Sequence, residues 1–286
     1  MKFAFIRDHL REYPVRAVCR VLAVSPAGYY AWRDRPASLR QRRRELLAAR
    51  IQTVHTLNRR VYGSPRIHEA LLAVGEKVCQ NTVAKLMRQR NIRAKTKKKF
   101  VPRTTDSTHD QPVARNLLQR QFAAELPNQK WAVDITYIPT DEGWLYLAGV
   151  LDLCSRKIVG WSMADHMETG LVSDALKMAI ARRSPGAGLL HHSDRGSQYA
   201  SEDYQQALEA RGMICSMSGR GECWDNACME SFWSTLKTEL VHHEDYATRE
   251  QARQSIFEYI EAFYNRQRLH SSLGYVSPEA FEASLN

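Results

Sequence analysis

The spacing of apolar residues in the first third of the chain predicts short helices. Apolar side chains recur every three or four positions over residues 15–22, which is the period of an amphipathic helix. Ala23 then offers a small residue for a tight turn, and Ser25 offers a cap for a following helix with an aromatic packing face. Residues 15–32 therefore favour a helix-turn-helix, although a plain helical hairpin would give the same pattern.

A second helical unit is expected over residues 62–92. Ser64 can cap its first helix, Pro65 suits the first turn, and Gly75 ends it. Residues 80–90 predict a further helix with apolar side chains on one face and basic side chains on the other. We expect it to be the recognition helix, because the basic run that follows it favours contact with phosphates over a merely solvated face. The DNA contacts expected here are Arg88, Lys95, Lys97, Lys98 and Lys99.

Beyond residue 127 the pattern changes to strands and helices. Residues 100–127 are rich in Thr, Gln and Pro with weak periodicity, which is typical of a linker. Three strands followed by alternating helices and strands indicate an α/β domain with a mixed sheet. The expected organisation is a helical DNA-binding region at 1–99, the linker, and the α/β domain at 128–286. The expected strands are 131–139, 144–153, 157–163, 189–193 and 214–217, and the expected helices are 169–183, 202–211, 226–241 and 248–266.

Charge is distributed unevenly along the chain. Residues 1–127 hold 27 Lys and Arg against 9 Asp and Glu, a net charge of +18, whereas residues 128–286 hold 14 against 22, a net charge of −8. A basic region joined to a separate acidic domain is typical of a protein that binds a polyanion. Together with the helix-turn-helix patterns, this asymmetry favours double-stranded DNA as the partner.

Neither an export signal nor a membrane span is predicted. Charged residues interrupt the apolar stretch at the N-terminus, and no uncharged apolar run approaches the roughly 20 residues that a span needs. The six cysteines include no Cys-x-x-Cys, which favours reduced thiols in a cytoplasmic protein. We expect this protein to be bacterial and associated with the nucleoid. A zinc site that combines Cys223 and Cys228 with His191–His192 or His242–His243 stays an alternative, although its spacing fits no common pattern.

Three carboxylates occupy positions that an ordinary core would not favour. Asp134 interrupts the apolar strand Trp-Ala-Val-Asp-Ile-Thr-Tyr-Ile, Asp194 follows the strand at 189–193, and Glu230 lies on a predicted helix. Burying a bare carboxylate costs several kcal/mol, so each of them needs a cation partner. One strand Asp alone is more often a satisfied structural acid, but three in this order, with 35 residues between the last two, favour a joint role.

These residues suit phosphodiester chemistry. Hydrolysis or transesterification needs an activated oxygen nucleophile and relief of charge on the leaving oxygen. Two magnesium ions about 3.5–4 Å apart meet both needs when Asp and Glu oxygens hold them. Asn226 and Lys237 fall on the Glu230 face of the predicted helix, so we expect both to contact DNA there. For Lys237 the alternative is a solvated surface lysine.

Four stretches carry a family resemblance. The closing stretch is Tyr-Asn-Arg-Gln-Arg-Leu-His-Ser-Ser-Leu-Gly-Tyr-Val-Ser-Pro at 264–278, and the other three are Trp-Ala-Val-Asp-Ile-Thr-Tyr-Ile (131–138), His-Ser-Asp-Arg-Gly-Ser-Gln-Tyr (192–199) and Trp-Asp-Asn-Ala-Cys-Met-Glu-Ser-Phe-Trp-Ser-Thr-Leu-Lys (224–237). They resemble the motifs of DDE transposases and retroviral integrases, and more narrowly those of the second-frame (OrfB-type) transposases of the insertion-sequence-3 family. The resemblance covers nearly the whole chain, because Tyr62–Arg66 is also similar to the family's upstream helix-turn-helix region.

The resemblance implies an RNase H-like core in which Asp134, Asp194 and Glu230 bind metal and Lys237 is the basic residue that follows the glutamate. It implies two magnesium ions, with Mn²⁺ as a substitute, and attack by water that frees a 3′-hydroxyl at the element's end. That hydroxyl then attacks another strand. The expected enzyme is a transposase that acts as a homo-oligomer on terminal repeats and target DNA. An upstream-frame portion is the expected fusion partner, because the chain has no heptad zipper and reads as the second-frame product alone.

Two other functions are compatible with parts of the sequence. A structure-specific nuclease of the same polynucleotidyl transferase class fits the three carboxylates, but leaves two DNA-reading modules less well explained. A DNA-binding regulator with an idle α/β domain fits the helices, but the intact triad argues against it. Magnesium-dependent strand cleavage would exclude the regulator.

Overall fold

The computed structural model describes residues 1–96, 113–219 and 222–285. These residues fall into two units, Met1–Thr53 and Val54–Asn286. Lys97, Lys98 and Lys99, which the sequence predicts to contact DNA, lie outside the described residues. None of the described helices is long and apolar enough to cross a membrane.

The first unit is a small cluster of helices. The predicted cap is present, because the Ser25 hydroxyl accepts a hydrogen bond from Gly28 N at 3.3 Å. Ile6 packs with Val18, Cys19 and Tyr29 in a core, so a first helix that the pattern does not predict completes this unit. The elements are α1 (Lys2–Asp8), α2 (Val15–Val21), α3 (Pro26–Arg33) and the beginning of α4 (Leu39–Leu57).

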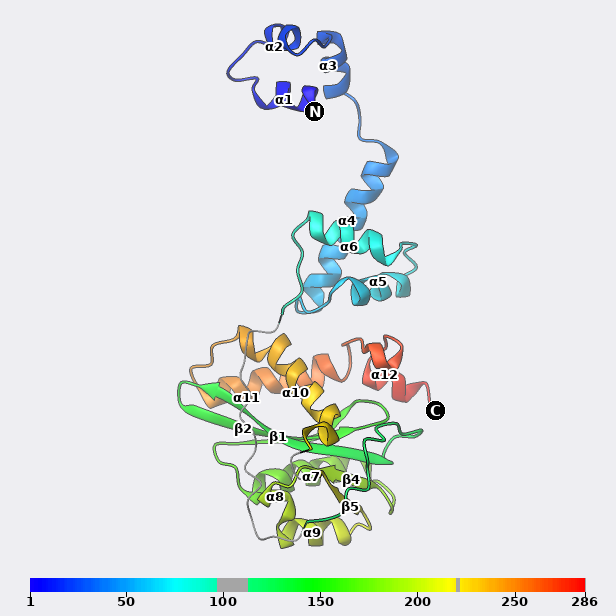
Figure 1. The fold of residues 1–286 in the computed structure, drawn as a ribbon, viewed down its shortest axis with the longest axis vertical. Coiled ribbons are helices and arrows are strands. Elements are labelled where there is room, and N and C mark those ends of the chain that lie inside the picture. The colour runs from blue at the N-terminus through cyan, green and yellow to red at the C-terminus, as the bar shows by residue number, and fades with distance from the viewer. Residues whose placement is uncertain (97–112, 220–221, 286) are drawn as a thin grey trace. The chain divides into compact units, whose positions relative to one another are not determined.

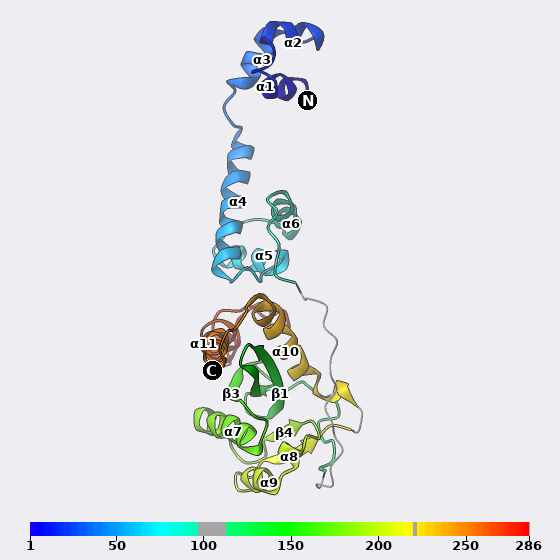
Figure 2. The same ribbon diagram turned by 90° about the vertical axis from the view of Figure 1, so that its left-hand side faces the viewer.

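Two further helices follow α4 in the second unit, α5 (Ser64–Ala73) and α6 (Gln80–Gln89), and they pack on each other (Figure 2). Both match predicted helices, and the predicted apolar side chains of α6 are buried. The expected cap is wrong, because α5 begins at Ser64 itself and Gly63 occupies the cap position without a side-chain hydrogen bond.

The rest of the second unit is built on a five-stranded mixed sheet in the order β3-β2-β1-β4-β5 (Figure 1). Each strand lies within one residue of its predicted limits, so the predicted RNase H-like α/β fold is confirmed. The antiparallel strands are β1 (Lys130–Thr140), β2 (Gly143–Asp152) and β3 (Ile158–Ala164). Strand β4 (Leu190–Ser193) runs parallel to β1, and β5 (Ile214–Met217) runs parallel to β4.

Helices cover both faces of this sheet (Figures 1 and 2). On one face α7 packs tightly against β3, because a Cβ at Gly160 would lie only 2.3 Å from Ala175 O and glycine leaves that space open. The core beneath α7 includes Trp131, Val150 and Leu176. The helices on this face are α7 (Thr169–Arg183), α8 (Ser197–Ala200) and α9 (Glu202–Glu209), and those on the other are α10 (Ala227–Glu239) and α11 (Arg249–Glu258).

The C-terminal region is less regular than predicted. One helix over 248–266 is expected from the pattern, but α11 ends at Glu258 and a π-helical turn, Tyr259–Tyr264, follows it. A last helix, α12 (Pro278–Ala283), is capped by the Ser277 hydroxyl, which accepts from Ala280 N at 3.2 Å. Short 3₁₀ turns occupy Cys223–Asn226, Val241–His243 and Ser271–Leu273.

Residues 113–127, within the predicted linker, lie along the α/β domain. Leu118 is buried, and its backbone N–H donates to the Ser216 hydroxyl on β5 at 3.2 Å. Asn116 Nδ2 and Arg120 Nε each donate to the Asp225 carboxylate at 2.8 Å. These contacts attach the segment to the turn that precedes α10.

Candidate active site

Asp134 lies near the middle of β1, half-buried, with both carboxylate oxygens hydrogen-bonded. Its Oδ1 accepts from Ile135 N at 2.8 Å, and its Oδ2 accepts from Trp233 Nε1 on α10 at 3.0 Å. In the neighbouring strand β2, the residue paired with Asp134 is Gly149. The carboxylate is therefore held on the face of the sheet that α10 covers.

The register of the sheet brings Asp194 to the level of Asp134. Strands β1 and β4 are parallel, and Ala132 pairs with His192. Each aspartate follows its strand's member of this pair by two residues, so the two side chains stand on adjacent strands at the same level. Gly196 N donates to Asp194 Oδ1 at 2.9 Å, which holds the start of the loop after β4.

Glu230 reaches the site from the first turn of α10 and is exposed. The helix is attached to the sheet just before it begins, because Asn226 Nδ2 donates to Val133 O at 2.9 Å. Val133 precedes Asp134 in β1, so this contact brings the start of α10 to the strand that carries Asp134. The structure thus brings together the three carboxylates that the sequence singles out.

The electrostatics of the three carboxylates are unfavourable without a cation. Burial raises the pKa of Asp134 from 3.8 to about 8, and the negative charges of Asp194 and Glu230 add to this shift. Burial also raises the pKa of Glu230. Clustered carboxylates bind protons tightly until a cation neutralises them, so this arrangement fits a divalent metal ion.

The chemistry of the donors suits a hard cation such as Mg²⁺, which prefers carboxylate oxygens. Within residues 1–96, 113–219 and 222–285, no three acidic, His or Cys side chains are already arranged as a metal-binding group. The alternative zinc site includes Cys223, whose side chain lies outside the described part of the structure, and Cys228 Sγ accepts from Arg156 Nη1 at 2.7 Å.

Asp134→Asn, which cannot ionise but loses one of the two oxygens that accept from Ile135 N and Trp233 Nε1, is expected to change the melting temperature of the metal-free protein more favourably at pH 8 than at pH 5. The folded pKa of Asp134 lies above its unfolded value of 3.8, so between these values the folded state holds a proton that the unfolded state has lost. The free energy of unfolding therefore falls as the pH rises through this window, and the amide removes the effect. Melting curves in EDTA at pH 5 and pH 8 measure it, and a change of equal size at both pH values would contradict the electrostatic cause.

Lys237 lies on α10 beside β1. Its Nζ is 4.9 Å from the centroid of the Tyr137 ring, and the side chain is half-buried. Burial lowers the pKa of Lys237, and the charge of Asp134 opposes this shift. The lysine therefore borders the site, and its contact with DNA stays a prediction.

The other predicted DNA contacts differ in their surroundings. Arg88 is exposed at the end of α6. Lys95 donates from Nζ to Glu239 O at 2.9 Å, so its ammonium is engaged at the end of α10. Asn226 is only 5% exposed and bonds the backbone of β1, so its position favours a structural role over the predicted contact.

Two residues of the site have roles that sequence reasoning misses. Trp233 follows Glu230 by three residues, and this spacing shows that both share a helix face, but not that the indole reaches Asp134. Gly149 gives no signal in the sequence, because only the pairing of β1 with β2 places it opposite Asp134.

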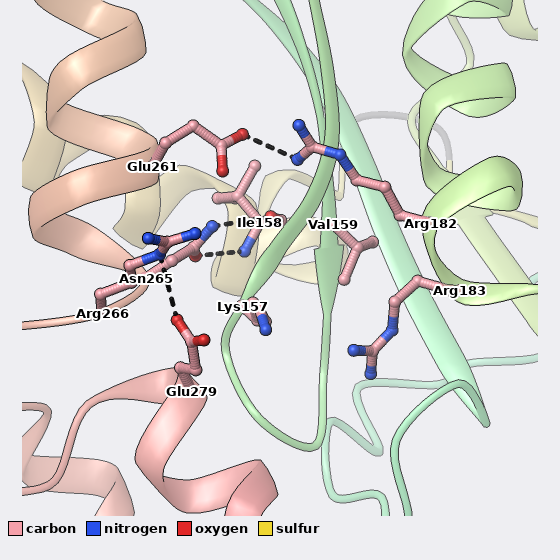
Figure 3. A pocket seen from close by; sticks show the side chains of 9 residues that line it. All are labelled: Lys157, Ile158, Val159, Arg182, Arg183, Glu261, Asn265, Arg266 and Glu279. Carbon is pink, nitrogen blue, oxygen red and sulfur yellow. Dashed lines mark hydrogen bonds and ion pairs between the residues drawn. The ribbon is translucent and has the colours of Figure 1, made fainter.

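A separate pocket of about 320 Å³ is lined by β3, α7 and the C-terminal segment (Figure 3). Four basic side chains line it, and acidic neighbours compensate all four. Such compensated charges favour a structural role in joining these elements over the binding of an anion. The ion pairs are Arg182 with Glu261, Lys157 and Arg183 with Glu282, and Arg266 with Glu279.

Known protein families match most of the chain. An HTH-like domain matches residues 41–100, and two models of the integrase core domain match residues 124–223 and 211–278. Among solved structures, the HTLV-2 integrase catalytic core domain in complex with magnesium is 15% identical, with a TM-score of 0.43 over 55% of this chain and 98% of that chain. The simian T-cell lymphotropic virus intasome in complex with PP2A regulatory subunit B56 gamma is 14% identical, with a TM-score of 0.47 over 81% and 74%.

Curated relatives match over nearly the full length. The chain is 46% identical over 284 residues to transposase InsF for insertion sequence IS3A of Escherichia coli (strain K12), which covers 99% of this chain and 98% of the relative. It is also 46% identical over 264 residues to the insertion element IS600 uncharacterized 31 kDa protein of Shigella sonnei, covering 92% and 97%. Identity at this level, together with the integrase core and HTH-like domains, shows that the chain belongs to the transposases of the insertion-sequence-3 family and acts in DNA transposition.

Proposed function

We propose that this transposase cleaves and joins DNA strands as a DDE enzyme, with Asp134, Asp194 and Glu230 as its metal-binding triad. The convergence of three carboxylates from β1, the end of β4 and α10 supports this assignment. Burial raises the pKa of Asp134 and repulsion from Asp194 and Glu230 adds to this shift, which supports the assignment further. Two Mg²⁺ ions, with Mn²⁺ as a substitute, fit this set of oxygen donors.

In this proposal the residues of the chain hold the reacting groups in place. Asp134, Asp194 and Glu230 would hold Mg²⁺, which when bound would activate a water and relieve charge on the leaving 3′ oxygen. Asp134 stands on β1 and Asp194 directly follows the adjacent, hydrogen-bonded strand β4, whereas Glu230 approaches from a helix. The freed 3′-hydroxyl then attacks a phosphodiester of another strand, so one bond forms as another breaks.

The proposed substrate is double-stranded DNA at the element's ends and at the target. The basic region 1–127, with its net charge of +18, supports binding to the phosphate backbone. Arg88 is exposed in the last turn of α6, the proposed recognition helix, and its guanidinium is assigned a contact with the phosphate backbone. Action as a homo-oligomer, fusion to an upstream-frame portion and a place at the nucleoid belong to the same proposal.

Incubating the full chain with its flanking element-end DNA and Mg²⁺, followed by mapping of nicks, tests the proposal. The expected result is nicks at the element's ends that expose 3′-hydroxyls, followed by joined strands. Cleavage that follows DNA shape instead of the end sequence would point to a structure-specific nuclease. End binding with no cleavage would point to a regulator, and either result would contradict the proposal.

Lys237→Ala is expected to lower the rate of cleavage at the normal site by about 10- to 100-fold, or to shift the position of the nick, while metal binding and folding persist. Seven residues are almost two helical turns, so Lys237 falls within about 20° of Glu230 and about 10.5 Å further along the helix. That reach suits a phosphate one or two nucleotides from the scissile bond. Lys237→Arg should keep part of the activity, because the charge survives although the donor geometry changes.

Rates and nick positions are compared with those of Lys177→Ala. Lys177 is an exposed lysine on α7 whose Nζ pairs with Asp174 at 3.0 Å, so its loss should leave cleavage unchanged. If Lys237→Ala cleaves at the normal site and rate, the lysine is a surface residue without a role in positioning DNA.

A further inference from the structure

Trp233 makes a contact in the site that the triad does not explain. Its side chain is 6% exposed, and its Nε1 donates to Asp134 Oδ2 at 3.0 Å. A buried indole N–H without a partner is costly, so this hydrogen bond stabilises the placement of the ring. Because Trp233 follows Glu230 by three residues on α10, one side chain links the strand of the first carboxylate to the helix of the third.

Strand β2 leaves room for this indole. Gly149 is the residue paired with Asp134, and a Cβ there would lie 2.9 Å from Trp233 Cη2 and 3.2 Å from Met229 Cε. Gly149 is not among the described glycines with positive φ, so its backbone conformation would accept other residues. The space that the Trp233 ring occupies, rather than the backbone, is therefore what excludes a side chain at Gly149.

The hydrogen bonds to Asp134 leave its oxygens able to bind a metal ion. Oδ1 accepts one bond from Ile135 N, and Oδ2 accepts one from Trp233 Nε1. An ionised carboxylate offers about four acceptor sites over its two oxygens, so each oxygen keeps a free site. Two donors on different oxygens also restrict rotation of the carboxylate plane. A carboxylate with only one donor would rotate more freely.

We propose that Trp233, seated against Gly149, is a positioning residue that orients the Asp134 carboxylate for metal binding and ties it to the helix of Glu230. This inference rests on the proposed triad. Hydrogen bonds to metal ligands from neighbouring residues typically change metal affinity or activity by about 10- to 100-fold. Loss of the indole bond should therefore weaken metal binding without abolishing the reaction.

Two single variants test the inference in the full chain. Trp233→Phe removes the N–H and keeps an aromatic ring, whereas Gly149→Ala keeps the N–H and displaces the ring. Each is expected to raise the Mg²⁺ concentration at half-maximal cleavage by about 10- to 100-fold, with cleavage recovering at saturating Mg²⁺. Adding Mn²⁺ at a fixed concentration should raise the melting temperature of both variants by less than it raises that of the unchanged chain. This measurement reports metal binding independently of activity.

The double variant, Trp233→Phe with Gly149→Ala, shows whether the two changes weaken metal binding through one shared hydrogen bond or through two separate packing defects. If both changes act through the same hydrogen bond, the double variant should need no more Mg²⁺ than the worse single variant. Two independent effects would multiply instead, and that result would overturn the proposal. Should Trp233→Phe fail to fold, as its metal-free melting curve would reveal, Gly149→Ala alone decides the test.

Matched controls exist for both changes. Trp161 Nε1 donates to Glu261 Oε1 at 2.8 Å, so Trp161→Phe removes an indole–carboxylate bond outside the triad. Gly170→Ala adds a methyl group where no atom lies within 4 Å. If Trp233→Phe and Gly149→Ala respond to metal like these controls while Asp134→Asn loses the response, the positioning role is overturned and the triad stands. If Asp134→Asn keeps the response, the proposed function itself fails.

Discussion

Replacing Asp134 by Asn, Asp194 by Asn or Glu230 by Gln is expected to abolish end cleavage while binding to end DNA persists. Each amide keeps the shape of the side chain but removes the charge that would hold the cations. Loss of a single catalytic residue has cost about 10⁴- to 10⁶-fold in kcat in a well-studied hydrolase. We therefore expect at least about a 10³-fold loss, measured as nicked product from labelled element ends with gel-shift binding in parallel.

Asp141→Asn is the matched control for these variants. Asp141 follows β1 at the turn into β2 and is exposed, so the same chemical change occurs on the same hairpin away from the triad. Its cleavage should equal that of the unchanged chain. Substantial residual cleavage in Asp134→Asn, with Asp141→Asn normal, would show that the triad assignment is wrong.

The strands and the candidate acids are predictable because local spacing determines them. Each strand has an apolar pattern of its own, and Asp134 stands out as a charge inside such a pattern. The closeness of Asp134 to Asp194 has a different origin. It follows from the pairing of Ala132 with His192, which depends on how β4 returns beside β1 and leaves no trace in either segment alone.

Contacts between distant segments explain what the sequence does not reveal. Lys95 belongs to a basic run, yet its ammonium bonds Glu239 O, 144 residues further along the chain. Asn226 shares a helical spacing with Glu230, yet its amide is buried against Val133 O. Spacing predicts which residues share a face, but the partner that covers that face comes from the fold.

In the closing stretch 264–278, too, the sequence does not reveal the partner of a key side chain. Asn265 uses both ends of its amide, accepting from Ile158 N at 3.0 Å and donating to Ile158 O at 2.9 Å. Its side chain thereby continues the hydrogen bonding of β3 at the edge of the sheet. A resemblance to a family marks such a residue without giving its reason, and here the reason is attachment of the C-terminal region to the sheet.

Arg268→Met is expected to lower the free energy of unfolding by about 3 kcal/mol, because it removes both charged hydrogen bonds of a buried carboxylate and leaves only Arg66 Nη1, 4.0 Å from Glu239 Oε1, as a cation. Arg268 and Glu239 are 4% and 6% exposed. Arg268 Nε donates to Glu239 Oε2 at 2.8 Å and Arg268 Nη2 donates to Glu239 Oε1 at 2.6 Å. The Tyr259 hydroxyl also donates to this carboxylate at 2.8 Å, but a neutral donor does not replace the lost charge.

Chemical denaturation measures the loss, which corresponds to a fall in melting temperature of roughly 6–12 °C for a domain of this size. Arg266→Met is the control, because the Arg266–Glu279 pair is exposed and such pairs contribute up to about 1 kcal/mol. Replacing both partners, as Arg268→Met with Glu239→Leu, should recover part of the stability, since the buried carboxylate is gone and Arg66 keeps its hydrogen bond to Leu269 O at 2.8 Å. Glu239 is the last residue of α10, so the single variant should also loosen the helix that carries Glu230 and slow cleavage. If Arg268→Met is no less stable than Arg266→Met, the buried pair does not hold the end of this helix.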